Sequence, residues 1–503
     1  MAAAPATTSP WFEKWPQLGT DDEFARLRRL FEESNYTVEG ICNRFGVTEL
    51  DAFSLPPVDG RPLNDHLDAL IALFFDCGFV DESKIAAALP EGSMELFESL
   101  GLLSRDSAPA GAVYTSAAIL PIFGVLTACD RAIGPDRKPC HYPSDVVYPP
   151  VFDTTHRFRE ELPTSECEAM LDLGTGSGIA ALLCAPTAGH IWATDITSRA
   201  ERFAEFSRRL AGLSNVTVLQ GDMYAPVEGL TFDRIVTHPP YVSNRIRRAG
   251  LVFGESGDDG EEIIRRAVEG VPSVLRPGGR FHSLQVASDR EGESFEQRIR
   301  KWLGPADEEF DVLVLVHGRF TPLEFLANNQ LRSQFTPEGL REWVGLWEDT
   351  RTESMIYATV IIERHDQPRQ PITHRVRKGS GYTGRELEWL MDWLKATVQP
   401  DHVEMLLNCR PAARTDCELC EMRRLEDGRF QPEHFSLEIP GPFASTLSCE
   451  EWLTEVLPRC DGTRTWREQY EHAVAARLIR PEVPIEAFAS LLGMLVAIGA
   501  LKV

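Results

Sequence analysis

The stretch Leu171-Asp-Leu-Gly-Thr-Gly-Ser-Gly178 decides the fold of this 503-residue chain. Its apolar start stops at the glycines, and helix-forming residues resume directly after Gly178. This change of pattern predicts a buried strand, a tight turn and a helix, in that order. Glycine at the turn lets the backbone approach a ligand closely, and the three glycines are Gly174, Gly176 and Gly178.

The residues that follow strengthen this prediction, because polar groups stand where further strands should end. The expected second strand, 190–194, runs into Asp195, about 20 residues past the glycine turn, where an acidic residue binds ribose hydroxyls in Rossmann-like sites. A third strand over 215–219 leads to Asp222-Met223, and a fourth over 232–237 leads to His238-Pro-Pro-Tyr241. Glycine turns occur without ligands, so the ordered set carries more weight than any one motif.

Taken in order, these motifs resemble those of the class I S-adenosylmethionine-dependent methyltransferases. The last motif is similar to the (Asn/Asp)-Pro-Pro-Tyr box of the HemK-like N-methyltransferases, which methylate planar nitrogens. The resemblance covers about residues 142–366 and implies an α/β fold with a Rossmann-like seven-stranded sheet, and S-adenosyl-L-methionine as cofactor. The cofactor-binding residues that it implies are Asp172, Gly174, Thr175, Gly176, Gly178, Asp195, Ile196, Asp222, Met223 and His238.

The acceptor box implied by the resemblance consists of His238, Pro239, Pro240 and Tyr241. The prolines stiffen the loop, and Tyr241 can lie against a planar acceptor group. His238 departs from the asparagine of the family. A neutral imidazole can orient an NH group, and with an ordinary pKa near 6.5 it can also act as a general base. The substrate class therefore stays open at this position.

Three arginines just beyond the box form a second candidate for substrate binding: Arg245, Arg247 and Arg248. They are either a solvated loop or a site for a carboxylate or phosphate on the substrate, which the planar guanidinium suits. Elsewhere, Cys417 and Cys420 have zinc-ligand spacing, with Cys409 upstream and His402 or His434 nearby. The cysteine pair is not repeated, so we expect no metal.

Composition limits the class of protein. The hydrophobic content of 43% indicates a globular chain, and no apolar run approaches the ~20 residues of a membrane span. The N-terminal residues lack a secretory pattern and the 11 cysteines are scattered, so we expect a cytoplasmic protein with reduced thiols. The formal charge of −25 argues against extended nucleic-acid binding, although a local basic patch is compatible with it.

Three domains are expected. Residues 1–138 have helical periodicity followed by strand candidates at 113–115 and 119–126, which predicts a winged-helix-like accessory domain. Residues 139–366 carry the methyltransferase motifs and further strands over 279–286, 310–316 and 355–362. The last two should be antiparallel, separated by an insertion that includes a helix over 337–347. Residues 367–503 form an α+β or helical accessory domain with helices over 451–457, 466–477 and 485–498.

The sequence thus predicts a methyltransferase acting on a planar nitrogen, either a protein glutamine amide or a nucleobase amine. A small-molecule N- or O-methyltransferase is the alternative that the acidic surface and His238 favour. A nucleic-acid-binding regulator that only senses the cofactor is a third, which the intact cofactor and acceptor motifs disfavour.

Overall fold

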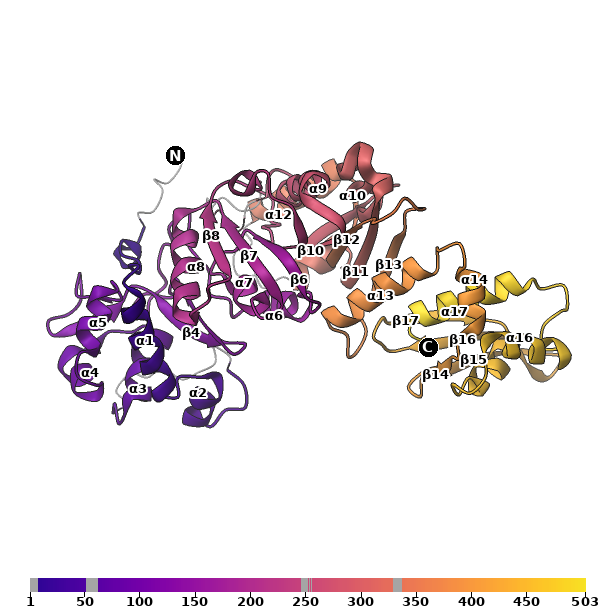
Figure 1. The fold of residues 1–503 in the computed structure, drawn as a ribbon, viewed down its shortest axis with the longest axis horizontal. Coiled ribbons are helices and arrows are strands. Elements are labelled where there is room, and N and C mark those ends of the chain that lie inside the picture. The colour runs from indigo at the N-terminus through magenta and orange to yellow at the C-terminus, as the bar shows by residue number, and fades with distance from the viewer. Residues whose placement is uncertain (1–7, 51–61, 246–251, 253, 255, 329–336) are drawn as a thin grey trace. The chain divides into compact units, whose positions relative to one another are not determined.

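The computed structural model describes residues 8–50, 62–245, 252, 254, 256–328 and 337–503 (Figure 1). It divides into two compact units, residues 1–276 with 336–346 and residues 277–335 with 347–503. The domain boundaries expected from the sequence, at 138/139 and 366/367, fall inside these units and remain predictions.

The N-terminal part of the first unit is helical, as its periodicity predicts. Its elements are η1 (Pro10–Phe12), α1 (Asp21–Glu33), α2 (Val38–Phe45), α3 (His66–Leu70), η2 (Ile71–Phe75), β1 (Val80–Asp81), α4 (Glu82–Ala88), α5 (Ser93–Ser99), β2 (Leu103–Ser104), β3 (Ala112–Thr115), β4 (Ala118–Ile122) and β5 (Val125–Cys129). Strands β1, β3 and β2 form one small sheet, and β4 pairs with β5. The winged-helix assignment of this part stays a prediction.

One expectation for this part is wrong. The single strand expected over 119–126 is the hairpin β4–β5, because the chain reverses at Phe123 and Gly124. Both residues have positive φ, +52° and +84°, which a continuous strand does not allow.

The part of the first unit that carries the sequence motifs contains the four strands that these motifs predict. Its elements are α6 (Asp153–Glu160), β6 (Cys167–Leu173), α7 (Ile179–Cys184), β7 (Ala188–Asp195), α8 (Ser198–Ala211), β8 (Val216–Gln220), η3 (Ala225–Val227), β9 (Phe232–Thr237) and α9 (Glu262–Val274). The strands are parallel in the order β9-β6-β7-β8. Leu173 pairs with both Thr194 and Thr237, so the carboxyl ends of three strands meet at one edge.

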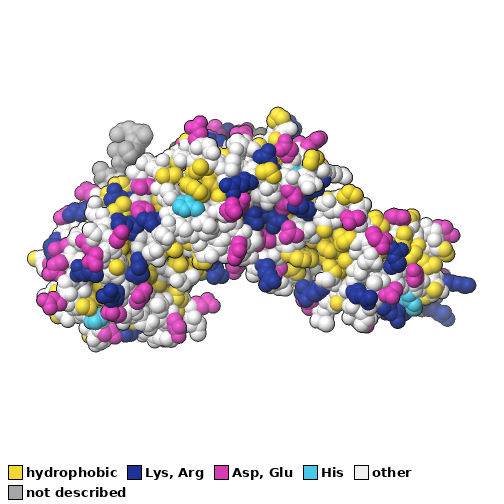
Figure 2. All heavy atoms as spheres, viewed as in Figure 1, with side chains coloured by type: hydrophobic (Ala, Val, Ile, Leu, Met, Phe, Trp, Pro, Cys, Tyr) yellow, Lys and Arg dark blue, Asp and Glu magenta, His cyan; other side chains and the backbone are white. Residues whose placement is uncertain are grey.

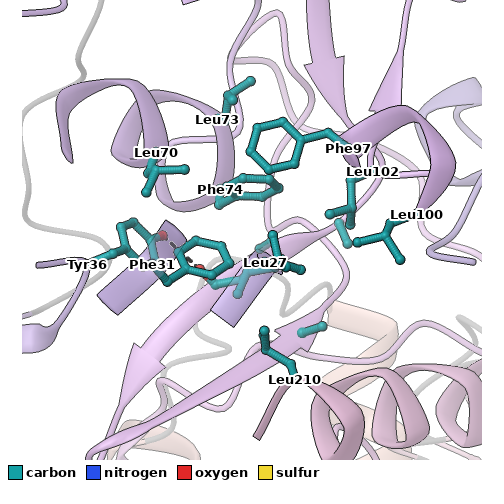
Figure 3. Close-up of a cluster of buried hydrophobic side chains, with 14 of the residues drawn as sticks. Leu27, Phe31, Tyr36, Leu70, Leu73, Phe74, Phe97, Leu100, Leu102 and Leu210 are labelled. Atoms are coloured by element: carbon teal, nitrogen blue, oxygen red, sulfur yellow. Dashed lines mark hydrogen bonds between the residues drawn. The ribbon is translucent and has the colours of Figure 1, made fainter. Parts of the chain in front are cut away.

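The N-terminal helices share one hydrophobic core with α8. Leu27, Phe31, Phe74 and Phe97 pack in the cluster that also includes Leu210 of α8 (Figure 3). Beside this core, the buried carboxylate of Asp130 holds the guanidinium of Arg199 at 2.6 Å. The helical part of this unit and the part that carries the motifs are therefore joined by both apolar and ionic contacts.

The second unit contains the remaining predicted strands. Its first elements are β10 (Leu275–Arg290), α10 (Phe295–Leu303), η4 (Gly304–Glu309), β11 (Phe310–Phe320), α11 (Pro322–Asn328), β12 (Thr352–Arg364) and β13 (Thr373–Arg377). Helix α12 (Pro337–Thr350) begins in the residues of the first unit and ends in those of the second. The strand order is β13-β11-β12-β10, and β11 and β12 are antiparallel, as predicted. Strand β13, parallel to β11, is an addition to the seven strands expected.

The C-terminal part of the second unit is α+β and shares a hydrophobic core with side chains of β11, β12 and β13. Its elements are α13 (Gly384–Ala396), α14 (His402–Asn408), β14 (Ala412–Ala413), β15 (Glu418–Glu426), β16 (Arg429–Ile439), β17 (Ser445–Cys449), α15 (Glu451–Val456), η6 (Leu457–Arg459), α16 (Trp466–Ala475), α17 (Ile485–Ala497) and β18 (Leu501–Lys502). The three predicted helices are present. Leu315 of β11 and Ile361 of β12 lie in the same core cluster as Leu390 and Leu492 of the helices.

Candidate active site

The glycine turn after β6 is open on the side where a ligand would bind. The N–H groups of Gly174 and Thr175 both donate to the carbonyl of Thr194, at 2.8 and 2.9 Å, which fixes the turn against the end of β7. Gly174 and Gly176 have φ of +75° and +58°, and a Cβ built on either would meet no atom within 4 Å. A Cβ on Gly178 would instead approach the Cα of Ala204 at 3.3 Å. The first two glycines thus leave space for a ligand, and the third allows α7 and α8 to pack closely.

Two carboxylates lie beneath this turn. Asp172 is buried and accepts hydrogen bonds from the Thr175 hydroxyl at 2.6 Å and the Ala181 N–H at 3.1 Å. Burial raises the pKa of Asp172 to about 6. Asp195 accepts the N–H groups of Gly176 and Thr197, both at 3.0 Å, and burial raises its pKa as well.

These residues fit a cationic cofactor that carries a ribose. A carboxylate has about four acceptor positions, so Asp195 keeps acceptor capacity for a ribose hydroxyl beside the three hydrogen bonds it takes from Gly176 and Thr197. Ile196, at the end of β7, is 51% exposed and offers an apolar surface to a planar base. The Asp222 carboxylate pairs with Arg266 of α9 at 2.6 Å, and the adenine contacts expected of Asp222 and Met223 remain predictions.

His238 follows β9 at the same edge of the sheet. The hydroxyl of Thr237 donates to the carbonyl of Leu173 at 2.7 Å and so fixes the end of β9 beside the glycine turn. The Nε2 atom of His238 is buried, and within the described ranges it has no hydrogen-bond partner. Burial lowers the pKa of His238 to about 4, so the imidazole is neutral at physiological pH.

Two aromatic rings lie close to the His238 imidazole. The ring of Phe158, from α6, is 5.3 Å away with an interplanar angle of 31°, and the ring of Tyr241 is 6.1 Å away at 32°. Phe158 has no motif around it in the sequence and was not predicted as a site residue. Phe158 and His238 are 80 residues apart in the sequence, so no local sequence pattern indicates that their rings are in contact.

The segment Gly257-Asp-Asp-Gly260 packs against the acceptor box. The hydroxyl of Ser243 donates to the carbonyl of Asp258 at 2.6 Å, and the N–H of Asn244 donates to that of Gly257 at 2.8 Å. A Cβ on Gly260 would lie 3.0 Å from the carbonyl oxygen of Tyr241, so glycine is required there. Of the predicted substrate arginines, Arg245 lies beside this loop, and its N–H donates to the hydroxyl of Ser243. Arg247 and Arg248 lie outside the described residues.

The cysteine pair lies in the C-terminal part of the second unit. Cys417 precedes β15 and is half-buried, and Cys420 on β15 is exposed. In the part of the chain that the structure describes, there is no group of three or more His, Cys, Asp or Glu side chains placed to hold a metal ion. The described helices also include none long and apolar enough to cross a membrane.

Residues 152–285, which include the glycine turn and the acceptor box, are similar to known proteins. Residues 152–285 match the model of the methyltransferase small domain. The release factor glutamine methyltransferase of Moorella thermoacetica is 36% identical over 143 residues, which are 26% of this chain and 50% of that protein. The ribosomal protein uL3 glutamine methyltransferase of Bradyrhizobium diazoefficiens is 32% identical over 158 residues, 29% of this chain and 49% of that protein.

Solved structures of methyltransferases are also similar to part of the chain. The ribosomal protein L11 methylase of Lactobacillus delbrueckii subsp. bulgaricus matches at 19% identity with a TM-score of 0.25, over 41% of this chain and 75% of that one. A TM-score this low does not define a fold, which rests instead on the strand order and motifs above.

The matched region is a class I S-adenosylmethionine-dependent methyltransferase domain. The curated relatives that match this region are named as glutamine methyltransferases. This chain spans about half the length of the curated relatives that it matches.

Proposed function

We propose that the protein transfers a methyl group from S-adenosyl-L-methionine to a planar nitrogen, the side-chain amide of a glutamine in a cytoplasmic protein. The observation that carries this proposal is the buried, unpartnered Nε2 of the neutral His238, next to the glycine turn. A buried polar atom without a partner is costly unless a ligand supplies the missing hydrogen bond. An amide NH₂ group can supply it.

The residues of the acceptor box then act by orienting the acceptor group. The bound cofactor supplies an electrophilic methyl group, so the protein needs mainly to orient the acceptor and exclude water. His238 and the main chain between Pro239 and Pro240 hold the NH₂ group, and Tyr241 lies against the plane of the amide. Asp195 holds the ribose, and the open backbone at Gly174 and Gly176 receives the rest of the cofactor.

The acceptor class follows from three considerations. The curated relatives are named as glutamine methyltransferases of proteins. Acidic and basic side chains are interspersed on the face drawn in Figure 2, and the net charge is −25, which does not favour a nucleic-acid acceptor. An imidazole with a pKa of about 4 is a poor general base for a hydroxyl, which disfavours the O-methyltransferase alternative.

The test uses the full-length protein and cofactor with a labelled methyl group. It is incubated with a lysate of the source organism, which is then separated into protein, RNA and small-molecule fractions. Label in protein that acid hydrolysis releases as methylamine is expected, because hydrolysis of an N-methylated side-chain amide gives that product. Label confined to RNA or to small molecules would refute the proposed acceptor, and absence of cofactor binding would refute the proposed activity.

A further inference from the structure

The β4–β5 hairpin of the N-terminal part contacts the glycine turn directly. The hydroxyl of Thr127 on β5 is fully buried and donates to the carbonyl of Ser177, within the turn, at 3.3 Å. Its neighbour Ala128 donates its N–H to the hydroxyl of Ser207 on α8 at 2.9 Å. Strand β5 is therefore hydrogen-bonded both to the glycine turn and to helix α8.

The tip of the same hairpin contacts α6. The ring of Phe123 lies 4.6 Å from the ring of His156 at an angle of 83°, and the guanidinium carbon of Arg159 lies 4.7 Å from the centre of the Phe123 ring. Phe123 adopts a φ of +52°, which is uncommon for an aromatic residue and persists only where the surroundings impose it. The strained backbone places the ring between two side chains of α6.

Helix α6 carries these contacts to the acceptor box. Phe158 lies between His156 and Arg159 in the sequence, is 7% exposed, and packs against the imidazole of His238 at 5.3 Å. One hairpin thus contacts the cofactor side of the site through Thr127 and the acceptor side through Phe123 and α6.

We propose that the β4–β5 hairpin is a positioning element of the active site, in which Thr127 sets the glycine turn and Phe158, supported by Phe123, sets the imidazole of His238. The second half of this inference rests on the proposed function. Methyl transfer depends on the alignment of acceptor and methyl group, and displacements of about 1 Å are costly. Part of the N-terminal accessory region therefore belongs to the catalytic architecture.

The cofactor half is tested with Thr127→Val, which keeps the shape of the side chain and removes the hydroxyl. We expect the Kd for S-adenosylhomocysteine, measured by calorimetry, to rise about fivefold, and Thr127→Ser to restore it. The matched control is Thr115→Val, because the Thr115 hydroxyl is equally buried and donates to the carbonyl of Leu73, away from the turn. Equal effects of the two valine substitutions on Kd would overturn this half.

The acceptor half is tested with Phe158→Leu, which keeps the apolar volume and removes the ring. We expect kcat to fall about tenfold at an unchanged cofactor Kd, and Phe158→Tyr to retain activity. Phe31→Leu, in the core of the N-terminal helices, is the control for a general loss of packing and should leave kcat unchanged. Wild-type kcat in Phe158→Leu would overturn this half.

A second measurement separates failure of this inference from failure of the proposed function. In protein with ¹³C-labelled histidine, the His238 signal is identified by its loss in His238→Asn. It should shift in Phe158→Leu, because the ring current of Phe158 is removed, and stay in place in Phe31→Leu. If no methyl acceptor is found, the proposed function fails, whereas the His238 signal and the Thr127 binding data still decide whether the hairpin positions the site.

Discussion

The substitution His238→Asn distinguishes an orienting group from a general base. It restores the residue typical of the box and keeps a hydrogen-bonding group at the position of the buried Nε2. If His238 only orients an amide, the loss corresponds to one imperfect hydrogen bond of about 1 kcal/mol, or a few-fold in kcat. If it removes a proton, the loss should be ~10²- to 10⁴-fold. Initial rates with saturating cofactor and acceptor measure the difference.

The pKa of His238 adds a second expectation for the same variant. Burial lowers the pKa of His238 to about 4. The rate of methyl transfer should therefore not follow a titration near pH 6.5, which an ordinary histidine would give. The folded state then takes up the proton only below the pH at which an unfolded histidine does. The free energy of unfolding therefore falls progressively as the pH drops from 6.5 towards 4, by about 1 to 2 kcal/mol at pH 5.

His238→Asn lacks this titration, so its unfolding midpoint should fall less between pH 7 and pH 5 than that of the wild type, by a few degrees. Other titrating groups are common to both proteins and cancel in the comparison. Equal pH dependence of the two midpoints, or a His238 signal that titrates between pH 6 and 7, would refute the assignment of a buried neutral imidazole. A loss of activity beyond a hundredfold would refute the orienting role.

Three further predictions concern the rest of the chain. Asp195→Ala should raise the cofactor Kd at least tenfold, since a hydrogen bond to a charged group contributes about 1.5 to 3 kcal/mol, and unchanged binding in calorimetry would exclude Asp195 as the ribose ligand. Arg199→Leu should lower the free energy of unfolding by about 3 to 5 kcal/mol because Asp130 stays buried without its partner, and Asp130→Leu added to it should recover part of that loss in denaturant titrations. Metal analysis should find well under one zinc per chain, with a chelator leaving the unfolding midpoint unchanged; stoichiometric zinc would assign Cys417 and Cys420 as ligands.

The centre of the candidate site could be predicted from sequence because its residues follow strand ends. Each motif comes directly after an apolar run, and parallel strands in register bring such positions to one edge. In the structure, Leu173 pairs with Thr194 and with Thr237. This register places the glycine turn, Asp195 and His238 at the same edge of the sheet.

The parts that could not be predicted depend on contacts between distant segments. Strand β13, with the sequence Thr-His-Arg-Val-Arg, resembles a polar linker because it lies at the edge of its sheet and only Val376 is buried in the core. The pKa of His238 is likewise invisible in the sequence, because the burial that lowers it comes from the folded surroundings. Composition and periodicity carry no information about contacts between segments that are distant in the sequence.

The carboxylates at the glycine turn show how the site favours its cofactor. Asp172 and Asp195 both have pKa values raised by burial, and their described hydrogen bonds come from neutral hydroxyl and N–H groups. A raised carboxyl pKa means that the ionised form destabilises the folded protein as the pH rises through about 4 to 6. A ligand that brings positive charge to the turn relieves this cost, whereas a neutral nucleoside does not.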